Sequence, residues 1–259
     1  PRNRRKRRKV SLLKDGFGKA YSVLSRYYEN LAEEDGYEEW GKRVLKLAEK
    51  YAKGKKCADL ACGSGYFTRV LKKAGFDVSG CDISSEMLTE AERKSAEENL
   101  YIEYRKQDLA AFRSFEKLDL VTVINDGFNY LDGEKLRKAI KSISKNLKPG
   151  GALIFDVSSE YKIKNILANN VFAEDLNDLT LLWFNELTGN KLTMSLTFFI
   201  KDGEKYVRKD ETHVQYAHSV EFIQNALKEV GLTPVEIFGK TENGVSENDE
   251  RINFVAIKE

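Results

Sequence analysis

Hydrophobic residues near the start of the chain recur at spacings of three and four positions, which places them on one face of a helix. This pattern predicts helices over residues 17–30 and 37–52, the second stopped by Gly54. The apolar positions that carry the second helix are Tyr37, Trp40, Val44, Leu47 and Tyr51.

Between residues 57 and 157, short apolar runs alternate with helical patterns, which indicates crossover connections and a parallel sheet with helices on both faces. Strands are predicted over residues 57–61, 76–81, 101–106, 118–124 and 152–157. Helices are predicted over residues 68–73 and 85–98, and over 136–147, where Pro149-Gly150-Gly151 ends the helix.

The rhythm changes over residues 161–218, which are rich in β-forming residues and predict an antiparallel meander inserted into the parallel fold. Its predicted strands are 179–187, 191–200 and 206–216. Ser219 then caps a helix stopped by Gly231, and residues 233–238 and 252–257 predict two closing strands.

These patterns divide the chain into four parts. Residues 1–10 form a basic tail expected to be disordered, and residues 11–54 form an N-terminal helical segment. Residues 55–157 and 219–259 form the main α/β domain, and residues 158–218 form the inserted β subdomain, which is expected to act as a substrate lid.

Charge limits the classes of partner. The 259 residues carry 43 Lys and Arg against 41 Asp and Glu, but seven of the basic residues lie within residues 1–9. The remainder is slightly acidic, so RNA, DNA or an anionic membrane would be attracted only by the tail, which is otherwise a solvated extension. No apolar run suits a membrane span or a signal peptide, which favours a cytoplasmic protein.

Cysteine and histidine are scarce. Cys57, Cys62 and Cys81 lie in or beside strand-like runs without metal-ligand spacing, and are expected to be buried thiols in a reducing compartment. With only His213 and His218 present, no metal site is expected.

The strongest chemical signal is Asp59-Leu60-Ala61-Cys62-Gly63-Ser64-Gly65, where a strand leads through a small-residue turn into a helix. Gly63 and Gly65 permit positive φ and close approach of a ligand to the backbone. The helix offers unpaired amides to a carboxylate or phosphate. Nicotinamide-dinucleotide enzymes use a similar loop, but their third glycine is replaced here by Thr68.

Acidic residues follow the next two strands. Asp82 is placed to accept both hydroxyls of a ribose, unless it only caps the following helix. Gln107-Asp108 follows the third strand, where the acid can accept from an exocyclic adenine amine.

Together with Ile83-Ser84-Ser85-Glu86-Met87-Leu88 and Leu147-Lys148-Pro149-Gly150-Gly151, these segments resemble class I S-adenosylmethionine-dependent methyltransferases. The resemblance implies a Rossmann-like, seven-stranded, mostly parallel sheet and S-adenosylmethionine as cofactor, with S-adenosylhomocysteine as product. It places Asp59 near the cofactor's amino group, Gly63 and Gly65 along its methionine portion, and Asp82 on its ribose. The residues implied at the adenine are Ile83, Met87 and Asp108, although Ile83 and Met87 could equally be core residues.

The rest of the predicted cofactor-binding set is Tyr28, Trp40, Ala61, Gln107 and Asn125. Ala61 stands where many members of the family have glycine, which is tolerable if its φ stays negative.

The acceptor side carries no single catalytic motif. Asp126-Gly127-Phe128 lacks the two prolines typical of enzymes that methylate base or glutamine amide nitrogens, and no Pro-Cys pair for carbon-5 cytosine transfer is present. Asn129-Tyr130-Leu131 and the meander are similar to bacterial small-molecule methyltransferases. The expected function is methyl transfer to nitrogen or oxygen of a small molecule. The alternatives are methylation of RNA or tRNA, using the tail, and a non-catalytic cofactor-binding regulator.

Asn125, Asp126 and His213 are the predicted catalytic residues, the first two because ligands bind at the carboxyl ends of parallel strands. Three plainer interpretations remain open: the aromatic residues pack in the core, Asp126 caps a turn, and His213 shares a solvated strand face with Glu211 and Gln215. Further candidates for the acceptor pocket are Tyr27, Tyr28, Tyr37, Trp40, Asp156, Trp183 and Glu211.

Overall fold

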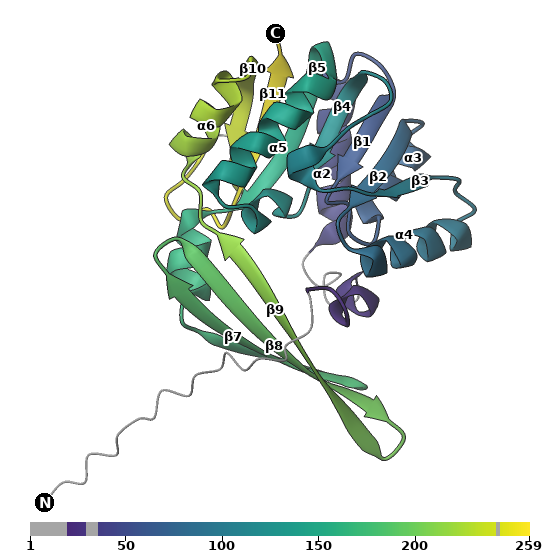
Figure 1. The fold of residues 1–259 in the computed structure, drawn as a ribbon, viewed down its shortest axis with the longest axis vertical. Helices are drawn as coiled ribbons and strands as arrows, with labels where there is room; N and C mark the ends of the chain where they lie inside the picture. Colours follow the sequence, from purple (N-terminus) through teal and green to yellow (C-terminus); the bar gives the residue numbers. More distant parts are fainter. Residues whose placement is uncertain (1–19, 30–35, 242–243) are drawn as a thin grey trace, which may run out of the picture.

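The computed structural model describes residues 20–29, 36–241 and 244–259 (Figure 1). Within them a seven-stranded sheet with helices stands above a separate four-stranded antiparallel sheet. The tail predicted over residues 1–10 lies outside the described residues.

The large sheet has the order β10-β11-β5-β4-β1-β2-β3, and β11 alone runs antiparallel to its neighbours. Every residue of β4 is buried, as expected for a strand covered on both faces. The chain order reverses between β1 and β4, so a crevice opens beyond their carboxyl ends, where α/β sheets bind ligands. The strands are β1 Lys56–Leu60, β2 Asp77–Asp82, β3 Glu103–Lys106, β4 Leu118–Val123, β5 Leu147–Ser158, β10 Leu232–Phe238 and β11 Arg251–Lys258.

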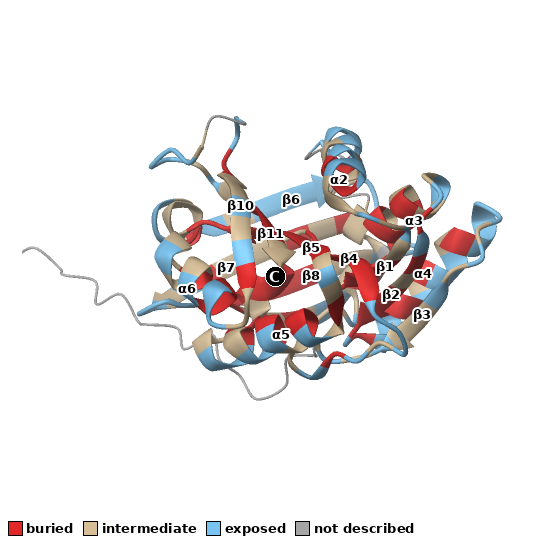
Figure 2. Ribbon diagram, turned by 90° about the horizontal axis from the view of Figure 1, so that it is seen from above, coloured by how far each residue is buried: buried red, intermediate tan, exposed pale blue. Residues whose placement is uncertain are grey.

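Helices cover both faces, each through an amphipathic stripe. One face packs on α5 and α6 through residues such as Ile140 and Leu227, and the other on α2 and α3 through Leu47 and Leu71. Figure 2 shows the buried residues concentrated in the strands between these layers. The helices are α2 Tyr37–Tyr51, α3 Tyr66–Lys73, α4 Ser85–Glu97, α5 Gly133–Asn146 and α6 Val220–Lys228.

The predicted α/β class and inserted meander are confirmed, with two corrections. The Pro-Gly-Gly segment does not end α5, because the helix stops at Asn146 and β5 begins at once with Leu147. The small sheet also has a strand that the pattern missed, β6 Val171–Leu176, whose residues are largely exposed. The other three strands of this meander are β7 Leu179–Thr188, β8 Lys191–Asp202 and β9 Lys205–Tyr216.

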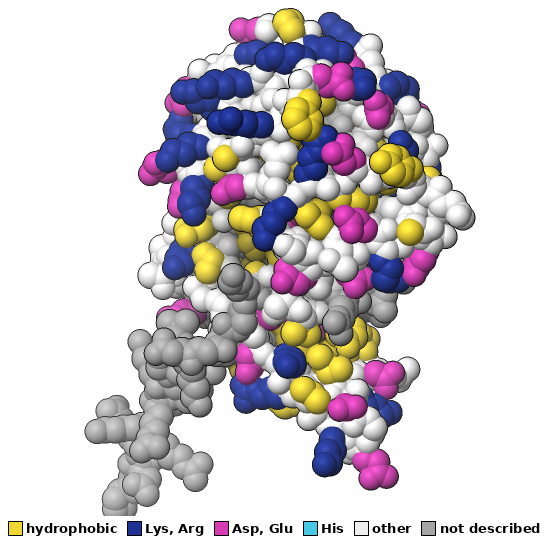
Figure 3. Space-filling view, turned by 45° about the vertical axis from the view of Figure 1, so that its right-hand side comes forward, with side chains coloured by type: hydrophobic (Ala, Val, Ile, Leu, Met, Phe, Trp, Pro, Cys, Tyr) yellow, Lys and Arg dark blue, Asp and Glu magenta, His cyan; other side chains and the backbone are white. Residues whose placement is uncertain are grey.

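The meander has its own core, formed by leucines of β7 and β8 against Ile163 and Leu167 of a π-helix, Lys162–Leu167. Figure 3 shows hydrophobic side chains at its junction with the seven-stranded body.

The prediction of one helix over residues 17–30 is wrong for the part described. Residues 20–29, named here the N-terminal strap, contain only a short 3-10 turn, Leu24–Arg26, and the first residues of a further helix at Tyr28. The reason is a distant partner: the backbone N–H groups of Tyr21, Val23 and Leu24 donate to the buried carboxylate of Glu211 in β9.

The strap is also fixed at its other end. The Glu29 carboxylate accepts from the Ser64 hydroxyl of the glycine loop and from Arg69 and Lys94, the last at 2.5 Å. Arg69 is itself buried and donates to the Ser64 carbonyl oxygen at 2.7 Å. The strap therefore links the small sheet to the loop that follows β1.

Candidate functional site

The glycine loop turns sharply between β1 and α3. A side chain at Gly63 (φ +55°) would meet nothing closer than Met87 Cε at 3.8 Å, so this position is open toward a ligand. Gly65 (φ +79°) has a different role, because its missing side chain makes room for the Tyr104 hydroxyl, 2.5 Å from an ideal Cβ. The condition set for Ala61 fails: its φ is +51°, a conformation that costs an alanine about 1–2 kcal/mol.

Asp59 lies beneath the loop, 1% exposed. Its carboxylate accepts from the hydroxyls of Thr68 at 2.5 Å and Thr122 at 2.7 Å. Burial raises its pKa to about 6, against the lowering effect of those two hydrogen bonds. Asp59 thus sets the loop from below rather than from a cavity wall.

A cavity of about 580 Å³ opens above the loop at the ends of β1, β2 and β3. Asp82 stands in its wall and accepts from the backbone N–H groups of Gly63 at 2.9 Å and Ser84 at 2.8 Å. Burial raises the pKa of Asp82, and those N–H groups oppose the rise. Ser84, whose hydroxyl accepts from Met87 N, is the helix cap, so the alternative that Asp82 serves as the cap is wrong.

The far end of this cavity suits a flat apolar group with a polar edge. Ile83 is 64% exposed although it is a large hydrophobic residue, and Met87 is buried on the same wall. Asp108 also lines the wall, with Oδ1 accepting from Ala110 N at 2.8 Å, while its Oδ2 accepts no hydrogen bond from the described residues. Gln107 uses its amide to hold Arg113, bonding both N–H and carbonyl of that residue.

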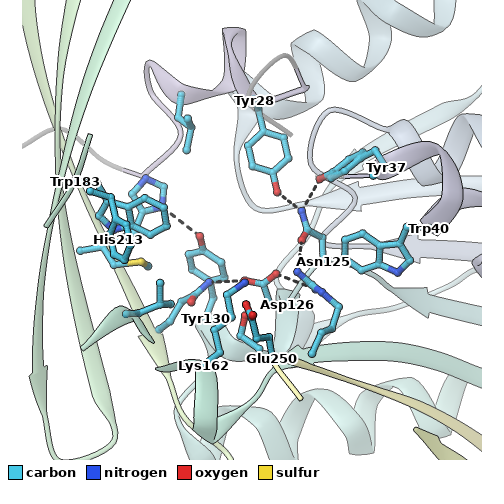
Figure 4. A pocket seen from close by; sticks show the side chains of 18 of the residues that line it. Tyr28, Tyr37, Trp40, Asn125, Asp126, Tyr130, Lys162, Trp183, His213 and Glu250 are labelled. Carbon is cyan, nitrogen blue, oxygen red and sulfur yellow. Dashed lines mark hydrogen bonds and ion pairs between the residues drawn. The ribbon is translucent and has the colours of Figure 1, made fainter. Parts of the chain in front are cut away.

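A larger cavity of about 920 Å³ lies between the ends of β4, β5 and β11 and the inner face of the meander (Figure 4). Its meander side is mainly apolar and its body side polar. The five residues that line both cavities are Tyr21, Tyr28, Tyr37, Asn125 and Tyr130, named here the shared wall.

The turn after β4 is held in a strained shape. Asn125 (φ +68°) and Asp126 (φ +53°) both have left-handed backbones, and their N–H groups donate to the two oxygens of Asp156, each at 2.8 Å. Burial raises the pKa of Asp156, while the guanidinium of Arg251, which pairs with it, lowers that pKa. Arg251 also stacks 4.0 Å above the Trp40 ring.

The side chains of this turn point into the larger cavity. Asn125 Nδ2 donates to the hydroxyls of Tyr28 and Tyr37, each at 2.5 Å. Asp126 accepts from Gln215 at 2.8 Å and from Arg251 at 3.3 Å. Asp126 makes no side-chain cap bond to its turn, Gly127–Tyr130, which rejects the interpretation of this residue as a turn cap.

His213 is part of a buried chain of hydrogen bonds. Its Nε2 lies 3.1 Å from Glu211 Oε2, and its Nδ1 lies 3.3 Å from the Tyr130 hydroxyl. Tyr21 donates to the same hydroxyl at 2.6 Å. Glu211, His213 and Gln215 are all at most 5% exposed, so the proposed solvated face does not exist.

Most of the predicted site residues line one or both of the two cavities. Within the cofactor set, Asp59, Gly65 and Trp40 lie off the smaller cavity, and Trp40 lines the larger one instead. Among the acceptor candidates, Tyr27, Asp156 and Glu211 line neither cavity, although Asp156 and Glu211 support residues that do.

Sequence reasoning missed Arg251, Tyr21 and the polar role of Gln215. A signal for Arg251 was present: it begins a last strand that runs antiparallel, so it lies at the edge where the parallel strands end. Nothing local to residues 20–29 indicates their contact with Glu211.

The described residues contain no group of three or more His, Cys, Asp or Glu side chains arranged to hold a metal ion. Among the helices described, none is both long and apolar enough to cross a bilayer. The three cysteines are buried, free thiols.

Comparison with known proteins gives consistent matches. Residues 57–151 match the model of the methyltransferase domain family. A Geobacillus sp. (strain WCH70) protein named "Putative methyltransferase GWCH70_2453" is 32% identical over 245 residues, covering 92% of this chain and 99% of that protein. The crystal structure of a S-adenosylmethionine-dependent methyltransferase from Clostridium acetobutylicum ATCC 824 is 31% identical with a TM-score of 0.84, covering 92% and 98% of the two chains.

The fold recurs in more distant proteins. The sugar N-methyltransferase KedS8 from Streptoalloteichus sp ATCC 53650 is 21% identical, with a TM-score of 0.71 over 96% of each chain. At that identity the likeness concerns the fold.

Proposed function

The chain belongs to the S-adenosylmethionine-dependent methyltransferases, and from this premise we propose that it methylates a nitrogen or oxygen of a small molecule bound in the larger cavity. The bound cofactor supplies a methyl group on a positively charged sulfur. The protein's part is to align an acceptor with that group and to keep water away.

The smaller cavity fits the cofactor chemically. Asp82 would accept the ribose hydroxyls, while Ile83 and Met87 would flank the adenine. Asp108 would accept from the adenine amine through its remaining oxygen. The open side of Gly63 would admit the methionine portion, with Asp59 supporting the loop beneath.

The larger cavity suits a compact amphipathic acceptor. Leu181, Trp183 and Leu196 of the meander offer apolar contact, whereas Asp126 and Arg251 offer charged groups on the opposite side. The meander, residues 158–218, would act as the lid on this site, and Asn125, Asp126 and His213 would contact or orient the acceptor. The described residues that line this cavity carry charges of both signs, which favours a small molecule over RNA; they are Arg43, Lys162, Lys240 and Arg251, and Glu39, Asp126, Glu174, Asp249 and Glu250.

The observation that carries this proposal is the shared wall. Because the same five side chains border both cavities, a methyl donor in one and an acceptor in the other would meet there with little else between them.

The test is a screen for S-adenosylhomocysteine release across amines, hydroxy compounds and tRNA, combined with calorimetry. Asp82→Ala is expected to weaken S-adenosylhomocysteine binding by about 100-fold, because it removes charged hydrogen bonds worth about 1.5–3 kcal/mol each. Asp77→Ala, at the exposed start of the same strand, is the matched control and should leave the affinity unchanged.

Release with tRNA alone would replace the small-molecule acceptor by the RNA alternative. Cofactor binding without release on any acceptor would favour the regulator. Unchanged affinity in Asp82→Ala would remove the proposed cofactor site.

A further inference from the structure

Three side chains that come from one strand and one turn form a linear hydrogen-bonded array ending at the shared wall. Glu211 and His213 lie two residues apart in β9, on the face buried against the body. Tyr130 ends the turn after β4 and lines both cavities. Figure 4 shows His213 and Tyr130 joined at the edge of the larger cavity.

From this array we propose that Tyr130 is a catalytic residue that takes the proton lost by the acceptor, and that His213 and Glu211 are positioning residues that draw Tyr130's own proton away. The proposal deepens the proposed function and rests on the acceptor occupying the larger cavity.

The direction of the array follows from Glu211. Its carboxylate receives the N–H groups of Tyr21, Val23 and Leu24 and the Ser22 hydroxyl, so among the described residues its hydrogen-bond partners other than His213 are all donors. Although burial opposes ionisation, these bonds and the bond from His213 hold the pKa of Glu211 below its usual value. An ionised Glu211 can only accept, so His213 carries its proton on Nε2 and presents an unprotonated Nδ1 to Tyr130.

The proton of Tyr130 is thereby directed to His213. Tyr21 already donates to the Tyr130 oxygen at 2.6 Å, so the Tyr130 hydroxyl must donate elsewhere, and Nδ1 at 3.3 Å is the acceptor in reach. The Gln215 amide also donates to the Tyr130 oxygen, so an acceptor group in the cavity would reach that oxygen by displacing Gln215, which keeps its bond to Asp126. Burial, together with the charge of Asp126, raises the pKa of Tyr130, so it stays protonated until a proton arrives.

The acceptor atom forms a bond to the methyl carbon, the carbon–sulfur bond breaks, and its electron pair stays on sulfur. The acceptor's proton moves to the Tyr130 oxygen while the Tyr130 proton moves to His213 Nδ1. The resulting imidazolium is stabilised by Glu211, and it loses its proton to solvent after product leaves.

Asp126 is the competing base, because its carboxylate also faces the larger cavity. Both of its oxygens are engaged, one by Gln215 and the other by Arg251, whose charge opposes protonation of the carboxylate. Among the described residues, further titratable groups near the array are Tyr21, whose ring lies 4.7 Å from His213, and Tyr28, on the shared wall.

The first measurement needs no acceptor. The chain has only two histidines, so ring-nitrogen NMR of labelled protein gives two sets of signals. His218 is an internal reference, because its Nε2 donates to the Leu131 carbonyl at 2.8 Å. His213 is expected to carry a proton on Nε2, and Tyr130→Phe is expected to shift its Nδ1 signal. A proton on Nδ1, or no shift in Tyr130→Phe, overturns the array.

Glu211→Gln makes the test sharper. A glutamine amide has one donor end, which must face either His213 or the backbone of the strap. If the donor end faces His213, the histidine proton moves to Nδ1 and the hydrogen bonds of the array reverse their direction. If it faces the strap, the hydrogen bonds from the strap's N–H groups are lost. Either result lowers turnover, and Glu186→Gln, at an exposed position of β7, is the matched control.

The second measurement is the pH profile of kcat and KM, with the acceptor identified by the release screen. Tyr130→Phe and His213→Asn are expected to lower kcat by about 100-fold or more, with KM changed little, and to abolish the acidic limb of the profile. Tyr101→Phe, fully on the surface, is the control. Each variant is first shown to bind S-adenosylhomocysteine like the unmodified protein.

If Asp126→Asn removes the acidic limb and Tyr130→Phe does not, Asp126 is the base and the proposal fails. If the screen finds no acceptor, the proposed function fails, while the NMR result still decides the array separately.

Discussion

Backbone strain is concentrated at the candidate site. Of the six non-glycine residues with positive φ among those described, Tyr21, Ala61, Asn125 and Asp126 border the two cavities. Such conformations cost on the order of 1–3 kcal/mol each, and they persist where surrounding contacts fix them. Asp156 provides this fixation for two of them by accepting both N–H groups of the turn.

Asp59 also carries an energetic cost, because its buried carboxyl group is harder to ionise than an exposed one. Its pKa of about 6 in the folded chain lies above its ordinary value of 3.8, so the folded state binds this proton more tightly than the unfolded state. The stabilisation is complete below about pH 4 and is lost as pH rises through 6. At pH 7 the ionised group therefore destabilises the fold by up to about 3 kcal/mol.

Asp59→Asn is expected to raise the free energy of unfolding at pH 7 and to lose this advantage toward pH 4. Urea denaturation at both pH values measures the difference, with Asp202→Asn at the exposed end of β8 as control. A variant less stable than the unmodified chain at pH 7 would show that the ionised carboxylate is a net stabiliser of the loop.

At the scale of elements, the loop between β1 and α3 combines tight packing with an open side. Gly65 is needed for packing against Tyr104, whereas Gly63 leaves open the space in which the proposed cofactor would bind. The two glycines of one motif therefore have different roles, packing for Gly65 and open space for Gly63, and the motif alone does not distinguish them.

Gly63→Ala is expected to lower stability by about 1–2 kcal/mol, through its positive φ, and to weaken S-adenosylhomocysteine binding by about 10-fold or more, because the new methyl group enters the cavity. Gly203→Ala is a matched control: its φ is +62° and nothing lies within 4 Å of the added carbon. Thermal unfolding and calorimetry separate the two effects. Equal affinities in both variants would place the ligand elsewhere.

The elements that sequence predicted best are those whose signal is local. Strand β4 appears as a largely apolar run interrupted by Asp119 and Thr122, and α6 carries both a serine cap and a terminal glycine. The strap and β6 were not predicted, because the strap is shaped by Glu211 nearly two hundred residues away and β6 is an exposed edge strand with little apolar pattern. In the site, the acids at strand ends were predictable, whereas Arg251 and the Tyr130 array depend on tertiary contacts.

At the scale of the whole molecule, only part of the long hairpin formed by β8 and β9 lines the larger cavity. Met194, Leu196, His213 and Gln215 line the larger cavity, while residues 201–206 at the tip line neither cavity. Ile200 and Val207 are directly paired, so a two-residue Asn-Gly turn can join them.

Replacing residues 201–206 by Asn-Gly is expected to leave S-adenosylhomocysteine affinity and turnover within about twofold, because only exposed pairs are removed. Trp183→Ala, in the same sheet but on the cavity, is expected to raise the KM for the acceptor instead. Steady-state kinetics compare them. A large loss of turnover in the shortened hairpin would mean that its tip takes part in catalysis.

Glu211 binds the strap, and Glu29 at the other end of the strap binds the glycine loop, so the inner part of the meander is structurally coupled to the loop proposed to hold the methyl donor. The apolar residues of the meander that line the larger cavity, including Leu181 and Leu196, are not part of this coupling. Substitutions of these apolar residues would therefore change the preferred acceptor, whereas substitution of Glu211 would disturb both the proposed acceptor cavity and the proposed cofactor loop.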